Sequence, residues 1–108
     1  MRFRYEALDF ATLFRTINSL QKGKHFVNGI GVVECNDNKG RIVNLQINSQ
    51  TRLRITSWDN SITIYFFDTV FIKEFNYNSF IIGRYSRASD NLIPIDIGDI
   101  TKVEVMCF

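Results

Sequence analysis

The spacing of apolar residues changes once along the chain, from the period of a helix to the two-residue period of strands. Large apolar side chains first recur three or four positions apart, on one face of a helix: Phe10, Leu13, Phe14, Ile17 and Leu20. Asp9 is a favourable N-cap residue, and Gly23 suits the position that follows a helix C-terminus. The pattern therefore predicts one amphipathic helix near residues 10–22.

After Lys24 the sequence favours strands joined by short turns. Runs rich in β-branched and aromatic residues alternate with clusters of Asn, Asp, Ser and Gly, and the runs cover residues 26–35, 41–48, 51–57, 61–67, 70–75, 80–85, 92–97 and 101–107. This spacing predicts a twisted antiparallel sheet of six or seven strands, which either is covered by the helix or curls into a half-barrel. The expected fold class is α+β, in a single domain that spans residues 1–108.

The segment 51–67 carries the strongest pattern and predicts a β-hairpin. Two alternating runs flank Asp59-Asn60, residue types that tolerate the positive φ angles of a two-residue turn. Such a turn would place Ile55 opposite Ile64, and Leu53 opposite Phe66, on an apolar face.

The opposite face of this predicted hairpin combines arginine with aromatic residues. It supplies the candidate partner-binding residues, which are Arg52, Arg54, Trp58, Tyr65 and Phe67. These residue types are enriched at protein–protein hot spots, and they also stack bases and hold phosphates in single-strand-binding sheets. The same pattern fits two structural roles, either a face covered by the helix or a solvated face with cross-strand cation–π pairs.

Composition is that of an ordinary globular protein, with 45% apolar and 22% charged residues. The net charge of +2 is too small to indicate nucleic-acid binding by itself. Charge is unevenly divided, because residues 1–54 hold nine basic and four acidic residues whereas residues 55–108 hold four and seven. An asymmetry of this kind can signal a charged partner, although both halves interleave within one small domain.

The residues needed for most catalytic or metal chemistry are scarce. His25 is the single histidine, and Cys35 and Cys107 are far apart, so they form a disulfide only if their strands are neighbours. Gly29-Ile30-Gly31 runs on into a strand rather than a helix, which excludes a dinucleotide-binding loop. Aspartates between residues 90 and 99 occupy turn positions. We expect no enzymatic activity, no cofactor and no metal.

These observations predict a small non-catalytic protein that binds a protein partner stoichiometrically, of the inhibitor, immunity or adaptor type. The alternative is a single-stranded nucleic-acid-binding domain. A third hypothesis is a ligand-binding or catalytic half-barrel that uses Asp96, Asp99 and His25. The N-terminal residues lack the apolar core of a secretory signal, and no apolar run is long enough to span a membrane, so we expect a cytoplasmic location. Oligomeric state and partner identity stay open.

Overall fold

The computed structural model describes residues 4–21, 31–88 and 91–107, and over these ranges it contains one α-helix and nine strands in three antiparallel sheets. The elements are β1 (Arg4–Leu8), α1 (Phe10–Gln21), β2 (Gly31–Asn36), β3 (Ile42–Ile47), β4 (Arg52–Ser57), β5 (Ile62–Phe66), β6 (Phe71–Phe75), β7 (Asn78–Gly83), β8 (Ile93–Asp96) and β9 (Ile100–Cys107), with short 3-10 helices η2 (Phe67–Thr69) and η3 (Ile97–Asp99). The predicted α+β class is confirmed. The strands exceed the predicted six or seven and do not form one sheet, and a half-barrel is not confirmed.

Helix α1 begins and packs as its sequence pattern predicts. The backbone N–H of Thr12 donates to Oδ2 of Asp9 at 3.1 Å, which makes Asp9 the N-cap. Leu13 and Ile17 are almost fully buried in the core. Phe10 and Phe14 are half-buried, with ring centroids 5.9 Å apart. Gly23, His25 and most of the Gly29–Gly31 segment lie outside the described residues, as do the side chains of Leu20 and Cys107.

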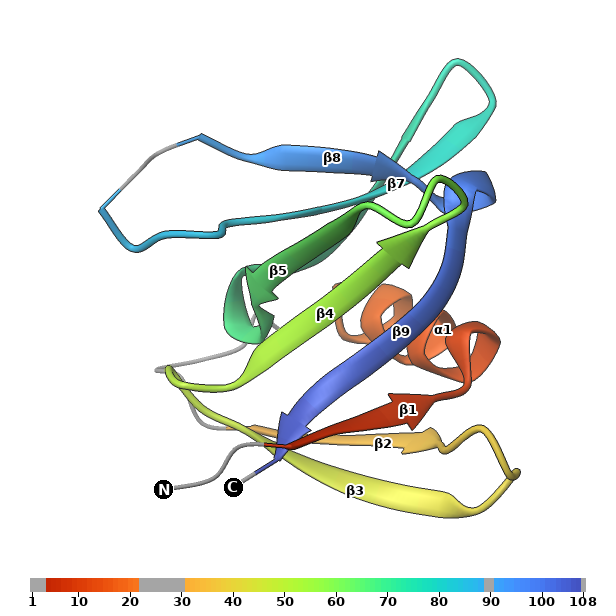
Figure 1. Cartoon of the computed structure of the whole chain (residues 1–108), viewed down its shortest axis with the longest axis vertical. Helices are drawn as coiled ribbons and strands as arrows, with labels where there is room; N and C mark the ends of the chain where they lie inside the picture. The colour runs from red at the N-terminus through yellow and green to blue at the C-terminus, as the bar shows by residue number, and fades with distance from the viewer. Residues whose placement is uncertain (1–3, 22–30, 89–90, 108) are drawn as a thin grey trace.

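Two threonines attach the polar side of α1 to strand β2. Thr12 Oγ1 accepts a hydrogen bond from the backbone N–H of Asn36 at 3.1 Å, and Thr16 Oγ1 donates to the carbonyl of Glu34 at 2.9 Å. The helix also packs against β6. It therefore bridges the two smaller sheets, and Figure 1 shows it on one side of the four-stranded sheet.

The three sheets enclose one apolar core. The largest has the order β1-β9-β4-β5, and alternate residues on its two central strands are completely buried: Leu53 and Ile55 on β4, Val103 and Val105 on β9. The two-stranded sheet β2-β3 adds Val33 and Ile47, and the three-stranded sheet β6-β7-β8 adds Ile72 and Ile81. Within the described ranges, no helix has the length and apolar character that a bilayer crossing requires.

The β4–β5 hairpin forms, but its register differs by one residue from the prediction. The observed pairs are Leu53 with Tyr65 and Ile55 with Thr63. The loop holds three residues rather than two, because the backbone N–H of Ser57 donates to the carbonyl of Ser61 at 2.9 Å, and Asn60 has a φ of 66°. A turn followed by a left-handed residue is the usual geometry of a three-residue hairpin loop.

This shift exchanges the two faces of β5. Tyr65 and Phe67 are completely buried, whereas Ile62 and Ile64 are exposed. The predicted assignment of Tyr65 and Phe67 to an accessible face is therefore wrong. Alternation on β4 fixes which of its residues face the core, but both alternating sets on β5 contain large apolar side chains, so the turn geometry decides between them.

The β6–β7 hairpin pairs two neighbouring runs predicted as strands, 70–75 and 80–85. Its turn is shorter than the four residues that separate these runs, because Phe75 pairs directly with Asn78. Asn76 and Tyr77 alone form the turn, with φ angles of 49° and 66°. Figure 1 shows this hairpin projecting beyond the rest of the molecule at one end of its longest axis.

Candidate functional site

Arg54, a predicted binding residue, is held by the protein's own side chains. Its guanidinium donates two hydrogen bonds to the carboxylate of Glu104, from Nε at 3.0 Å and from Nη2 at 2.9 Å. The same group lies 3.9 Å from the centroid of the Tyr5 ring. Glu104 is buried, and the hydrogen bonds from Arg54 lower the pKa of its carboxyl. The arrangement makes Arg54 a structural group that neutralises a buried acid.

Arg52 also stacks on an aromatic ring rather than projecting freely. Its guanidinium carbon lies 3.9 Å from the centroid of the Phe66 ring, and that of Arg87 lies 4.1 Å from the same centroid. Arg87 in addition donates to Oδ1 of Asp68 at 2.8 Å. Phe66 is 9% exposed. These arginines cover an aromatic side chain, as in the solvated cation–π alternative considered for this face.

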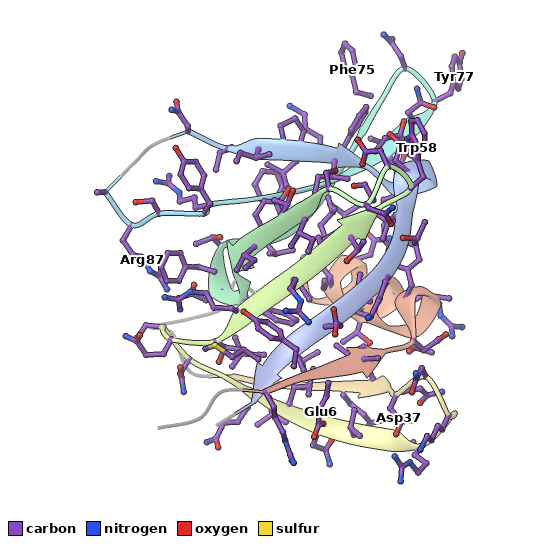
Figure 2. The ribbon with its side chains drawn as sticks, in the orientation of Figure 1. Glu6, Asp37, Trp58, Phe75, Tyr77 and Arg87 are labelled. Carbon is purple, nitrogen blue, oxygen red and sulfur yellow. The ribbon has the colours of Figure 1, made fainter. Side chains whose placement is uncertain are left out.

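The five predicted binding residues are not brought together. Tyr65 and Phe67 lie in the core, and the hydroxyl of Tyr65 donates to the carbonyl of Ile93. Arg52 begins β4, whereas Trp58 follows its last residue, so the length of the strand separates them. Figure 2 shows Trp58 far from Arg87, which shares the Phe66 ring with Arg52. Trp58 alone of the five is both large and mainly exposed, at 71%.

Trp58 lies at the same end of the molecule as two further exposed aromatic residues, Phe75 and Tyr77 (Figure 2). Phe75 is 62% exposed and Tyr77 is fully exposed. We call these three residues, Trp58, Phe75 and Tyr77, the aromatic tip. Large aromatic side chains exposed at one end of a molecule are candidates for an interaction site.

Two hairpins present the aromatic tip, and the short helix η3 links them. Trp58 lies in the β4–β5 loop, where its backbone N–H donates to the carbonyl of Asp99 in η3 at 2.9 Å. Helix η3 also packs against β7, whose first residue follows Tyr77. Asp96 caps η3 by accepting from the backbone N–H of Gly98 at 2.8 Å. Helix η3 therefore contacts both the loop that carries Trp58 and the strand that follows Tyr77.

Acidic groups lie close to two residues of the aromatic tip. The exposed carboxylates are Asp59 beside Trp58 and Glu74 beside Phe75 in the chain, and Asp99, whose backbone carbonyl accepts from Trp58. Hydrogen bonds from the hydroxyl and the backbone N–H of Ser61 lower the pKa of Asp59. The Asp59 side chain is therefore anionic at neutral pH. Lys73 supplies a nearby positive charge on β6.

Phe75 and Tyr77 are not among the candidates predicted from the sequence. Phe75 ends the predicted strand 70–75, and Tyr77 lies between this run and the next in a segment dominated by Asn and Ser, which indicates only a turn. A useful indication was present, since tyrosine is an unusual choice in a tight turn that requires positive φ. The exposure of Phe75 depends on the register of β6 and on the position of Phe75 at the end of that strand, which the sequence does not specify.

The candidate catalytic and metal-binding residues named from the sequence have roles in the fold or lie outside the described residues. Over these ranges, no group of three or more His, Cys, Asp or Glu side chains is placed to hold a metal ion. Of the residues named in the third hypothesis, Asp96 is the N-cap of η3 and Asp99 is its last residue. His25 lies outside the described residues. Cys35 is a free, buried thiol whose pKa is raised to about 11, chiefly by burial. A neutral buried thiol is a poor nucleophile.

Comparisons with protein-family models, with curated proteins and with solved structures gave no match.

Proposed function

We propose that this chain is a small non-catalytic binding protein that acts stoichiometrically on a protein partner, through the aromatic tip. The observation that carries the proposal is the exposure of Trp58, Phe75 and Tyr77 at one end of the molecule, on two hairpins, of which the β4–β5 loop is tied to η3 by a backbone hydrogen bond from Trp58 to Asp99. Rigid aromatic side chains bury a large area at little cost in entropy, and they dominate binding hot spots.

The backbone at Tyr77 supports a role for its side chain. A φ of 66° is a left-handed conformation that glycine adopts freely and that costs other residues about 1–2 kcal/mol. The turn keeps tyrosine at this position although the side chain is fully exposed and adds nothing to the core. Strain of this kind is common where a side chain serves binding rather than folding.

The acidic surroundings favour a partner with a cationic surface. Asp59, Glu74 and Asp99 would complement lysine and arginine side chains at the rim of the interface, where charge acts mainly on the association rate. Inhibitors, immunity proteins and adaptors are the functional types that we propose. The alternative of single-stranded nucleic acid has less support, because the tip carries carboxylates and Arg52 and Arg54 bind other residues of the chain.

The test is an affinity capture from a lysate of the source organism with three immobilised forms of the protein. The tip variant carries Trp58→Ser, Phe75→Ser and Tyr77→Ser together. A matched control carries Val32→Ser and Ile42→Ser, since these apolar residues of β2 and β3 are exposed to a similar degree, 66% and 68%. We expect the wild type and the control to retain the same protein, and the tip variant to lose it.

Two further measurements distinguish the named alternatives. Nuclease treatment of the lysate should leave the captured protein in place, and titration calorimetry with that protein should give a stoichiometry of one to one. Capture that all three forms share equally would contradict a role for the tip. Capture that nuclease abolishes would favour the nucleic-acid alternative.

A further inference from the structure

The three-stranded sheet has a second face that points away from the core. Strand alternation assigns the faces, because Ile72 on β6 and Ile81 on β7 are buried in the core. Their neighbours along the strands therefore lie on the opposite side, where Lys73 and Phe75 are exposed. We call this side the outer face, and it comprises Phe71, Lys73, Phe75, Asn78, Phe80, Ile82, Pro94 and Asp96.

The centre of the outer face is apolar and carries opposite charges on its two flanks. Phe80 on β7 pairs with Lys73 on β6 and with Asp96 on β8, so the three side chains form one row across the sheet. In the next row, Ile82 pairs with Phe71 on one side and with Pro94 on the other. In these two rows the middle strand is apolar, at Phe80 and Ile82, with a lysine on one edge of the face and an aspartate on the other.

This arrangement is complementary to itself. If a second copy packs face to face about a two-fold axis parallel to the strands, β6 of one copy lies over β8 of the other. Lys73 of each copy then meets Asp96 of the other, and the two Phe80 rings meet at the centre. Asp96 uses Oδ1 to cap η3, which leaves Oδ2 as the acceptor for the lysine of the second copy.

We propose that the chain forms a two-fold homodimer through the outer face of the three-stranded sheet. The match of Lys73 with Asp96 across Phe80 argues for a second copy, because a two-fold axis requires each surface to complement itself. The same axis leaves the strand direction unchanged, so both aromatic tips point to the same end of the dimer. The dimer would therefore present two copies of the proposed binding surface side by side, which increases avidity for a multivalent partner.

The test uses sedimentation equilibrium of the full chain and of two charge-reversed variants. We expect the wild type to dimerise, with a Kd of about 100 µM or lower. Lys73→Glu places like charges across the interface in its homodimer, and so does Asp96→Lys, so each variant alone should bind itself at least tenfold more weakly. In an equimolar mixture the glutamate of one meets the lysine of the other, and the mixture should regain dimers of near wild-type affinity.

Three controls keep the result clear. Lys39→Glu makes the same charge change on the exposed turn between β2 and β3 and should leave the Kd unchanged. Circular dichroism verifies folding, and if Asp96→Lys unfolds through loss of the η3 cap, Asp96→Asn serves instead, because asparagine also caps. When Asp96→Asn is added to Lys73→Glu, the double variant should regain part of the dimer affinity that Lys73→Glu loses.

A wild type that stays monomeric at about 1 mM would overturn the proposal. So would a dimer that is indifferent to both charge reversals, or a mixture that fails to recover. The triple substitution in the aromatic tip changes Phe75, at the end of the outer face, so Trp58→Ser alone separates the proposals. It should weaken partner capture and leave the dimer intact.

Discussion

The ring of Tyr65 lies directly on the backbone of Gly83. A Cβ atom at position 83 would lie 2.8 Å from Cγ of Tyr65, closer than real side chains approach, and 3.0 Å from Cδ1. The hydroxyl of the same tyrosine donates to the carbonyl of Ile93 on β8. Tyr65 therefore joins the last strand of the four-stranded sheet to two strands of the three-stranded sheet, and this connection sets the position of the outer face.

The contact predicts a steric cost for Gly83→Ala. The neighbouring ring is buried and held by its hydroxyl, so it cannot move aside, and overpacking of this kind costs about 1–3 kcal/mol. We expect the melting temperature to fall by about 4–8 °C for each kcal/mol, as measured by differential scanning calorimetry. Gly98→Ala is the milder comparison and should cost less, because there the one close atom is Oδ1 of the Asp96 side chain at 3.3 Å, which needs to move by only a few tenths of an ångström. Equal melting of Gly83→Ala and wild type would show that the ring is free to move.

The spacing of apolar residues was sufficient to predict the helix and its buried face, but not the face on which every strand residue lies. Asp9, Leu13 and Ile17 have distinct roles at fixed spacing, so the N-cap and the buried face of α1 follow from the sequence. The register of β5 depends on Asn60, which adopts a left-handed conformation and adds one residue to the loop. Both two-residue and three-residue loops tolerate asparagine, so the sequence did not distinguish them.

The candidate site depends on long-range contacts that local patterns do not encode. The chain separation between Arg54 and Glu104 is large, and their ion pair arises from the adjacency of β4 and β9. Without that contact, Arg54 looks like an accessible arginine. The aromatic tip likewise combines Trp58 with residues of a different hairpin, and η3 contacts both the Trp58 loop and strand β7. The sequence supplied Trp58 as a candidate and could not supply its neighbours.

Substitution of the two β4 arginines should separate structural from surface roles. Arg54→Ala leaves the buried carboxylate of Glu104 without its two hydrogen bonds, and we expect it to cost about 2–4 kcal/mol. Arg52→Ala removes one stacking contact on Phe66 and should cost about 0.5–1 kcal/mol. Urea unfolding of both variants measures the difference. Similar losses for the two would contradict the structural role given to Arg54.

The ion pair also predicts how stability depends on pH. The Arg54 hydrogen bonds lower the pKa of Glu104 in the folded protein below the ordinary value of about 4.3. The folded state therefore binds fewer protons, and this carboxylate contributes its full stability above pH 4.3. That contribution is lost as the pH falls through the folded pKa. We expect the free energy of unfolding to decline below about pH 4.3, as measured by urea titrations at successive pH values.

A variant identifies Glu104 as a source of this decline. Glu104→Gln cannot titrate, so its stability should start lower at pH 7 and fall less steeply towards pH 3. Some decline should persist, because hydrogen bonds from the backbone of Arg41 and Lys39 and from the Arg41 side chain lower the pKa of Asp37, and Ser61 lowers that of Asp59. A decline as steep as that of the wild type would assign the acid sensitivity to these other carboxylates.

Tyr77 offers the sharpest test, because folding and binding should respond to its replacement in opposite directions. Tyr77→Gly removes a side chain from a residue with a φ of 66°, where glycine is the favoured residue of a two-residue hairpin turn. We expect the protein to become more stable by about 1 kcal/mol, which thermal or urea unfolding would detect. The same change should weaken capture of the protein partner at least tenfold in Kd, because it deletes one of the three aromatic side chains of the tip.

Asn76→Gly is the matched control. It changes the neighbouring turn residue, which also has positive φ, without touching an aromatic ring, and it should leave binding unchanged. A stabilised Tyr77→Gly protein that binds as the wild type does would remove Tyr77 from the interface, and a destabilised one would show that the tyrosine serves the fold.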